Sequence, residues 1–302
     1  RRMREFQYDF GTDSYKADDL SVLSEHVLKA RVTQMAYAAS PDTVIWMTAP
    51  DAEHGYRLVG LTFNKSQEVT AYHPHAIGGE GVPTSVAVMP NPDGQDEVWF
   101  TVKRTINGTP VCYIERFALA STTGNDPITA YPDSHVVYSG AATDTFTGLD
   151  HLEGESVQIM APLWCAHPDA TVVSGDVTLT GEYTYAVAGL YEQAVMAPMR
   201  IEAGANDGTA MGKLQRINSV AVRLHNTVGG SVGPNLSEQD PIVYRTPEYD
   251  MGASTGLFTG DTEPLHWQGT YSREARVFVT QPQPLPMTVI AIMPQLKTED
   301  RG

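Results

Sequence analysis

The sequence has 302 residues, 41% of them hydrophobic, and a formal net charge of −16 at pH 7. That length suits one large domain or two to three ordinary ones, and the hydrophobic fraction is enough for a buried core. An excess of 36 acidic over 20 basic residues disfavours a protein that grips nucleic acid, and no apolar run reaches the ~20 residues of a membrane span.

Residues 1–30 are expected to form a lead-in with one short helix. Asp18 and Asp19 would begin the helix, where its dipole favours negative charge, and Leu20, Leu23 and Val27 recur on one face. The basic start is followed by polar residues instead of the apolar region of a signal peptide. Because the chain does not begin with Met, it is expected to be part of a longer protein.

Short strand-like runs separated by turn residues follow in residues 31–144. The first set falls within about 45 residues, the size of one β-propeller blade, and a second set repeats its order about 50 residues later. The runs are residues 32–37, 44–47, 58–63 and 69–73, then 84–89, 97–102 and 112–117. This pattern predicts two propeller-like blades with further blades upstream, because two blades cannot close a ring. A β-sandwich is the alternative.

The remaining chain is also expected to be β. Closely spaced hairpins in residues 145–205 predict a small antiparallel barrel or sandwich. Residues 206–302 are expected to form a C-terminal β segment with strands near 219–225, 242–245, 275–280 and 287–293. Since strands and helices do not alternate, the sequence predicts an all-β fold without an α/β enzyme core.

Two cysteines, Cys112 and Cys165, are too few for a disulfide scaffold or a structural zinc site. Both are expected to be small buried hydrophobic residues, which suits a reducing compartment such as the cytoplasm.

Two glycine-rich stretches superficially match catalytic motifs. Residues 229–233 read Gly-Gly-Ser-Val-Gly, as in a hydrolase nucleophile elbow around Ser231, but no helical pattern follows the serine. Residues 208–213 resemble a phosphate-binding loop, but the spacing is one residue short and Leu214 stands where a magnesium-binding hydroxyl is required. Loop glycines are the favoured interpretation of both stretches.

Three polar clusters are also interpreted as structural. His73 and His75, with His54 nearby, lack a third ligand of suitable spacing for a metal and are expected to be half-exposed loop histidines. Residues 91–97 are rich in oxygen ligands but lack a calcium-loop register, which favours a turn with solvated acids. The neighbours Asp150, His151 and Glu153 could suggest acid–base chemistry, but the sequence supplies no nucleophile for them. No catalytic, cofactor-binding or metal-binding residue is therefore assigned.

A series of stretches, in order from about residue 15 to the end, resembles the tail nozzle proteins (tail tubular protein B type) of short-tailed bacteriophages. In the first half they are residues 17–26 (ADDLSVLSEH), 40–46 (SPDTVIW), 58–63 (LVGLTF), 67–72 (QEVTAY), 113–116 (YIER) and 148–154 (GLDHLEG). In the second half they are residues 213–218 (KLQRIN), 258–261 (FTGD) and 284–294 (PLPMTVIAIMP). An insertion at residues 48–56 and Ser231 in the glycine loop depart from the family pattern.

The resemblance implies a non-enzymatic structural subunit of a homo-oligomeric ring, commonly of six copies, in the virion tail. Such a ring attaches below the portal and adaptor rings, forms the distal channel for DNA ejection, and carries fibres or spikes. Assembly would take place in the cytoplasm of the bacterial host. The resemblance implies no cofactor, no membrane insertion, and double-stranded DNA that passes without specific binding.

In that setting, the acidic excess would let DNA slide along the channel wall instead of adhering. Acidic residues of 93–97 or 250–261 are the candidates to face the channel. A carbohydrate-binding or receptor-binding tail module is the alternative function, since Trp46, Trp99, Trp164 and Trp267 could stack on sugars. Strand placement favours Trp46 and Trp99 as core residues instead.

Overall fold

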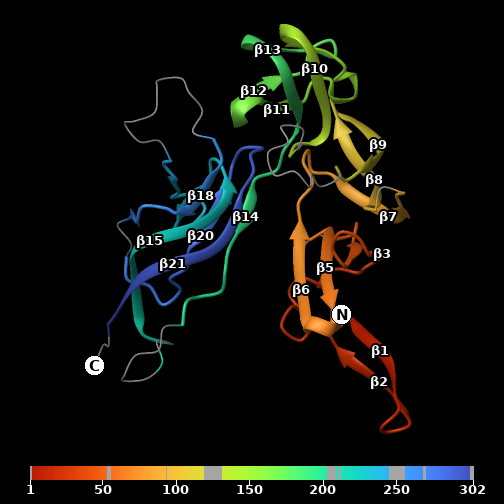
Figure 1. Cartoon of the computed structure of the whole chain (residues 1–302), viewed down its shortest axis with the longest axis vertical. Coiled ribbons are helices and arrows are strands. Elements are labelled where there is room, and N and C mark those ends of the chain that lie inside the picture. Colours follow the sequence, from red (N-terminus) through yellow and green to blue (C-terminus); the bar gives the residue numbers. More distant parts are fainter. Residues whose placement is uncertain are drawn as a thin grey trace. The chain divides into compact units, whose positions relative to one another are not determined.

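A computed structural model describes residues 2–52, 56–92, 94–118, 131–202, 209, 212–244, 256–267 and 270–299, and only the backbone of Leu163. The predicted all-β class is confirmed, because the elements in these ranges are antiparallel strands and short 3₁₀ turns (Figure 1). None of the helices in the described ranges has the length and apolar character needed to cross a membrane. The chain divides into unit 1, Arg1–Ser121 with His151–Glu155, and unit 2, Thr122–Asp150 with Ser156–Gly302.

Unit 1 contains a hairpin and two sheets whose strands follow one another in sequence. The hairpin pairs β1 (Arg4–Asp9) with β2 (Ser14–Asp19). The four-stranded sheet is β3 (Gln34–Ala38), β4 (Val44–Thr48), β5 (Leu58–Asn64) and β6 (Val69–His75), with the 3₁₀ turn η1 (Lys65–Gln67) between its last two strands. The three-stranded sheet is β7 (Val82–Pro90), β8 (Asp96–Ile106) and β9 (Thr109–Arg116), and the 3₁₀ turn η2 (Asp150–Leu152) reaches the unit from a later segment. The strand order agrees with the predicted repeat, with one strand fewer in the second set.

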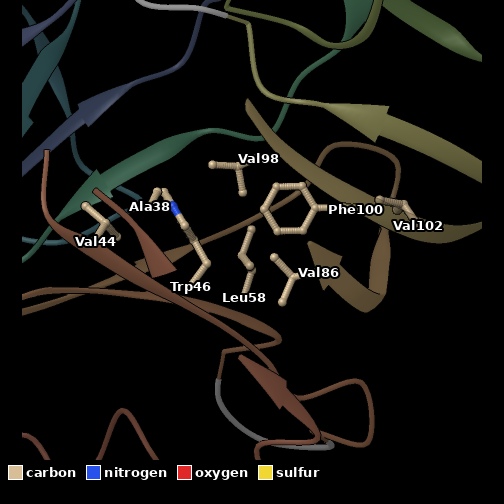
Figure 2. Close-up of a cluster of buried hydrophobic side chains, with 8 residues drawn as sticks. All are labelled: Ala38, Val44, Trp46, Leu58, Val86, Val98, Phe100 and Val102. Carbon is tan, nitrogen blue, oxygen red and sulfur yellow. The ribbon is translucent and has the colours of Figure 1, made fainter. Parts of the chain in front are cut away.

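The two sheets of unit 1 share one apolar core, drawn in Figure 2. The alternation of β8 directs Val98, Phe100 and Val102 to this core, where Phe100 meets Trp46 with ring centroids 6.2 Å apart. Burying a large aliphatic or aromatic side chain contributes about 1.5–3 kcal/mol, so this cluster holds the two sheets together. Packing of this kind is common to adjacent propeller blades and to a sandwich, and the propeller remains a prediction.

A polar contact fixes how the two sheets of unit 1 meet. The Asp96 carboxylate at the start of β8 accepts hydrogen bonds from the backbone N–H groups of Ala39 (2.6 Å) and Ser40 (3.1 Å) in the β3–β4 turn. The backbone N–H of Asp96 donates in return to the Ser40 carbonyl. Charge-assisted bonds to backbone donors are among the stronger hydrogen bonds, so this carboxylate acts as a clip between the sheets.

The opposite face of the β3–β6 sheet is covered by residues 20–28, where the sequence predicted a helix. That prediction is wrong: Asp18 and Asp19 end strand β2, and Leu23, expected on the buried face, is 92% exposed. The Asp19 carboxylate accepts from the backbone N–H and hydroxyl of Ser21, and the N–H of Ser24 bonds to the carbonyl of Ser21. These local bonds favour successive turns over a helix, and the turns bury Val27 and Leu28 against β4 and β5.

Unit 2 contains three four-stranded antiparallel sheets. The first is ordered β10 (Asp133–Phe146), β13 (Val177–Leu190), β11 (Ser156–Ala161) and β12 (Cys165–Thr171), with the 3₁₀ turn η3 (Pro162–Trp164) before its edge strand. The second is ordered β14 (Ala194–Met196), β20 (Phe278–Gln281), β16 (Ser231–Gly233) and β17 (Asp240–Pro241). The third contains β18 (Phe258–Asp261), β15 (Leu214–Thr227) and β19 (Leu265–His266), and β21 (Thr288–Glu299) also pairs with β15.

Two of these sheets form a sandwich. Alternate residues of β15, including Val220, Val222 and Leu224, pack against Val232 of β16 and Val279 of β20. The first sheet of unit 2 is open, so of the barrel or sandwich expected within residues 145–205, a closed barrel does not form in the described part of the chain. Residues 144 and 145, the expected domain boundary, lie within strand β10.

Both cysteines are exposed, so the prediction of two buried thiols is wrong. Cys112 lies on the outer face of β9, because the alternation of that strand directs its neighbours Val111 and Tyr113 towards the interior. Cys165 begins the edge strand β12 directly after the η3 turn. An apolar residue type alone does not determine which face of a half-buried strand a residue occupies.

A buried ion pair lies at the end of the β8–β9 hairpin. The side chain of Arg104 is fully buried. Its guanidinium binds both carboxylate oxygens of Glu115, and its Nε donates to the Gly78 carbonyl at 3.0 Å. Removing one member of a buried pair leaves the other charged and unpaired.

Substituting Glu115→Ala is therefore expected to lower the stability of unit 1 by about 3 kcal/mol, measured by chemical denaturation. The matched control is Asp261→Ala, which breaks the similarly bidentate but exposed Arg223–Asp261 pair. Its denaturation midpoint should stay close to that of the parent protein because solvent screens exposed pairs. Equal effects of the two substitutions would contradict the structural role of Arg104.

Candidate functional site

Ser231 lies in an antiparallel strand and does not form a nucleophile elbow. Strand β16 is paired on both sides, Ser231 facing Pro241 of β17 and Thr280 of β20. The adjacent glycines have packing reasons: a Cβ at Gly233 would lie 1.9 Å from the carbonyl oxygen of Glu238, and one at Gly230 would lie 2.9 Å from Cε of Met287. A strand-to-helix turn that lifts a serine above a parallel sheet is therefore not formed at this motif.

His73 and His75 are half-buried, as expected, but they lie on strand β6 and not in a loop, where they form an aromatic cluster with Trp46 beside the core of unit 1. The nitrogen Nδ1 of His73 lies 2.7 Å from Nε2 of His75, and Nε2 of His73 lies 3.2 Å from the hydroxyl of Thr62. The His75 ring centroid is 5.0 Å from that of Trp46. His54 lies outside the described residues, within which no group of three or more potential metal ligands occurs.

The position of the His73 ring depends on a glycine in the neighbouring strand. Gly60 lies between Trp46 of β4 and His73 of β6 in the register of the sheet. A Cβ at Gly60 would lie only 2.0 Å from Cε1 of His73, so the imidazole occupies the space that a side chain would take.

Burial makes both imidazoles poor bases. Desolvation, with a smaller contribution from the charge of His73, lowers the pKa of His75 from 6.5 to about 4, and desolvation also lowers the pKa of His73. Since the two rings share a hydrogen bond and face aromatic neighbours, their arrangement suits a neutral core pair.

A concave site of about 820 Å³ lies at the end of the β8–β9 hairpin, in unit 1. It is lined by Arg57, Glu80, Lys103, Arg104, Cys112 and Glu155, among others. Arg104 is already bound to Glu115, and Glu155 accepts a hydrogen bond from the backbone N–H of Asn107. The volume is that of ordinary ligand pockets, and the lining side chains outside these two contacts, Arg57, Lys103, Cys112 and Glu80, suit recognition of a polar or charged group more than catalysis.

The acidic residues singled out in the sequence make contacts within the protein. Asp96 clips the two sheets of unit 1, and Glu97 accepts from Arg116 and from the indole nitrogen of Trp99, so these acids are not simply solvated. Asp261 pairs with Arg223.

The Asp150–Glu153 segment also has a structural role. In unit 1 the hydroxyl of Tyr113 donates to the carbonyl of His151 at 2.7 Å, and Leu152 is fully buried. In unit 2 a Cβ at Gly175 would lie 2.5 Å from the Asp150 carboxylate. Acid–base chemistry has no support from this arrangement.

Of the four tryptophans, only Trp46 is in a fully buried core, as predicted. The same prediction for Trp99 is wrong, because Trp99 lies half-buried on the outer face of β8 with the Arg116 guanidinium carbon 5.5 Å from its ring centre. Trp164 and Trp267 are partly buried beside the apolar clusters of unit 2.

Several sequence features lie outside the described residues. They are Asp93, residues 208, 210 and 211 of the stretch 208–213, and residues 250–255 of the candidate channel loops.

Sequence reasoning missed the aromatic hairpin at the start of unit 1. Phe6, Tyr8 and Phe10 alternate with polar residues, which is the period of a strand, and all three side chains are exposed. The cationic residues of the concave site were missed as well, because Arg57 and Lys103 are far apart in sequence and no spacing rule connects them.

Comparison of the chain with protein-family models and with curated protein sequences gave no match.

The histidine pair predicts how stability depends on pH. Between about pH 6.5 and pH 4 the unfolded chain binds a proton at His75 that the folded chain does not, so folding becomes less favourable as pH falls. Unit 1 should lose about 2 kcal/mol between about pH 7 and pH 5, measured by chemical denaturation. The substitution His75→Leu should remove most of this slope, and substitution of the exposed His26→Leu should not. An unchanged slope in His75→Leu would contradict the assignment.

The close approach at Gly60 predicts a second effect. Substituting Gly60→Ala should destabilise unit 1 by about 1–3 kcal/mol, because the methyl group displaces the His73 ring. In a His73→Ala background the same substitution should cost much less, since the ring is gone. A double-mutant cycle from denaturation curves measures this coupling, and additive effects would show that the two positions do not compete for the same space.

Proposed function

We propose that the chain is a structural subunit of the tail nozzle of a short-tailed bacteriophage. In this proposal, copies form a ring, commonly of six, at the distal end of the tail. The ring attaches to the tail adaptor and to fibres or spikes, and double-stranded DNA passes through it without specific binding. The subunit performs no catalysis.

The observation that carries the proposal is the ordered series of sequence stretches that resemble this family along nearly the whole chain. Three of them, residues 40–46, 58–63 and 67–72, contribute to the neighbouring strands β4, β5 and β6. Three others, residues 213–218, 258–261 and 284–294, contribute to β15 and its partners β18 and β21. The stretch 113–116 contacts the stretch 148–154 through the Tyr113–His151 hydrogen bond. The resembling stretches thus support one another as a structural framework.

The net charge of −16 supports the same function. A lumen with excess negative charge repels the phosphate backbone at short range, and the screening length at physiological salt is about 8 Å. DNA close to such a wall is therefore kept from adhering, which suits a conduit.

The proposal is tested by imaging the protein with single-particle electron microscopy and measuring its mass in solution. We expect rings with a central opening wide enough for duplex DNA. A monomer that binds specific glycans on a glycan array would instead support the alternative, a carbohydrate-binding or receptor-binding tail module.

The charge argument makes a separate prediction about DNA. In an electrophoretic mobility assay, the protein should not retard duplex DNA at about 0.15 M salt, because it has no cationic excess with which to release counterions. Retardation that weakens steeply as salt increases would contradict a non-adhesive conduit.

A further inference from the structure

The β1–β2 hairpin has its apolar residues on the outside. Phe6 and Phe10 are 71% and 90% exposed, and Tyr8 and Tyr15 lie on the same face. Phe6 stacks on Tyr15 with centroids 4.9 Å apart and planes 6° apart, and Tyr8 meets Phe10 edge to face. These four residues are called the aromatic face below.

The other face of the hairpin is polar and turns towards the rest of unit 1. The Lys65 ammonium in η1 binds Glu5 and Gln7 from this face. A sheet face that packs on its own domain is ordinarily the apolar one. This hairpin therefore presents outwards the face that needs a partner.

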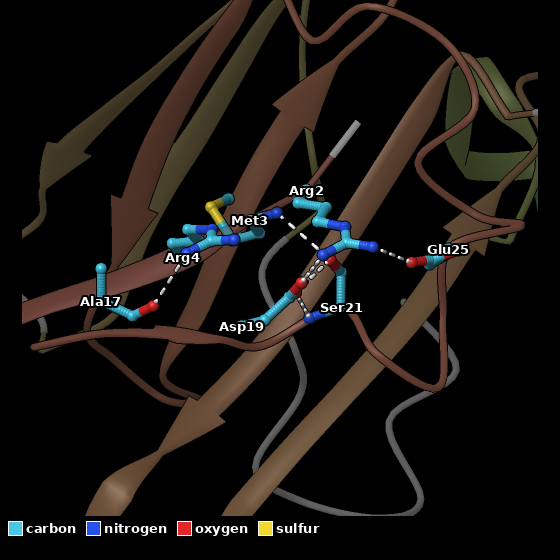
Figure 3. Close-up of polar contacts among 7 residues, drawn as sticks. All are labelled: Arg2, Met3, Arg4, Ala17, Asp19, Ser21 and Glu25. Carbon is cyan, nitrogen blue, oxygen red and sulfur yellow. Dashed lines mark hydrogen bonds and ion pairs between the residues drawn. The ribbon is translucent and has the colours of Figure 1, made fainter.

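Polar contacts connect the base of the hairpin to the segment that follows it, as Figure 3 shows. Arg2 bridges Asp19 and Glu25, at 3.4 Å and 3.3 Å, and the backbone N–H of Met3 donates to the Ser21 hydroxyl. An anchored hairpin loses less conformational entropy on binding than a free segment does, which favours a docking role.

We propose that the hairpin is an arm that docks on the outer face of the β8–β9 hairpin in a second copy of this chain. The inference rests on the proposed ring and names the surfaces by which neighbouring copies meet. The receiving surface consists of Lys103, Cys112 and Ile114 together with the concave site beside them. The aromatic face would cover Ile114, and the tip with Phe10 would enter the concave site.

Charge supports this pairing of surfaces. Residues 4–19 contain five acidic and two basic side chains; Asp9 and Asp13 lie near the tip, whereas Glu5 and Asp18 lie on the polar face. The concave site that would receive the tip is lined by the cations Arg57 and Lys103 together with Glu80. Its other two charged residues, Arg104 and Glu155, have partners of their own.

Apolar area supports it as well. Aromatic side chains offer about 150–250 Å² each, so the aromatic face can bury roughly 500 Å², against about 800 Å² per partner in a standard interface. Ile114, at the centre of the receiving face, is 76% exposed. This contact alone would therefore supply more than half of the area that each partner buries in a standard interface.

The arm and the receiving face belong to opposite sides of unit 1. The segment that follows the arm, residues 20–28, covers one face of the β3–β6 sheet, and β7–β9 cover the other face. In Figure 1 the arm and the β7–β9 sheet lie at opposite ends of this unit. A contact between opposite sides of identical copies is head-to-tail, and head-to-tail contacts close into rings when the rotation permits.

The first test compares association of the parent protein and the double variant Phe6→Ser/Phe10→Ser by sedimentation velocity over a dilution series. The variant should associate at least about tenfold more weakly, as expected for aromatic anchors. The control Met199→Ser/Leu236→Ser removes exposed apolar residues from unit 2 and should associate as the parent does. Both variants should keep the parent denaturation midpoint. Equal association of the parent and the arm variant would overturn the proposal.

The second test uses the two natural thiols. In the assembled protein, alkylation of Cys112 should be at least about tenfold slower than in the dissociated protein, because desolvated interface positions exclude reagent, whereas Cys165 gives the reference rate. In Phe6→Ser/Phe10→Ser at the same concentration, Cys112 should regain its fast rate. A Cys112 that reacts equally fast in both states would overturn the proposal.

The possible outcomes distinguish a failure of the proposed arm contact from a failure of the proposed ring. Rings that persist in the arm variant, with Cys112 reactive throughout, would contradict the arm and leave the proposed function standing. A protein that remains monomeric at every concentration would contradict both. A closed dimer that is lost in Phe6→Ser/Phe10→Ser but leaves Cys112 reactive to alkylation would show that two arms pair with each other. That result would overturn the head-to-tail contact.

Discussion

The contact between Trp46 and Phe100 joins the two sheets of unit 1, and the other features of that unit depend on it. The sheets meet only because β4 and β8 direct alternate residues to the same interior, and the Asp96 clip then fixes their relative position. The histidine pair packs against the same tryptophan, so a cluster that could suggest metal chemistry from the sequence is a neutral part of the core. Burial beside Trp46 accounts for the lowered pKa of both histidines.

The inner β3–β6 sheet differs from the outer elements because it is covered on both faces. The β7–β9 sheet packs on one face and the turns of residues 20–28 on the other, which explains the nearly continuous burial of β5. The peripheral elements are covered on one face only, and their outward faces can take part in assembly. The aromatic hairpin and the outer face of β8–β9 are two such faces, and in the proposed ring they are brought together between copies.

Strand positions in the first half of the chain could be predicted from the sequence, because turn residues separate clear apolar runs, and the predicted residues 44–47 and 58–63 closely match β4 and β5. Strand β10 was missed because its small and polar residues give no apolar period, and it forms through pairing with β13. The helix prediction failed because Asp19 and Ser21 form local bonds that periodicity does not register. The concave site could not be predicted, since its residues come together only through register and packing.

Strand β15 is the common partner in its sheet, pairing along its length with β21 and, on its other edge, with β18 and β19. Its pairing with β21 joins residues as distant in sequence as Leu214 and Glu299. During synthesis, the β15 segment therefore leaves the ribosome before the β21 segment with which it pairs. Until that pairing forms, its apolar residues lack their final cover, the state in which chains of this size are most prone to associate wrongly.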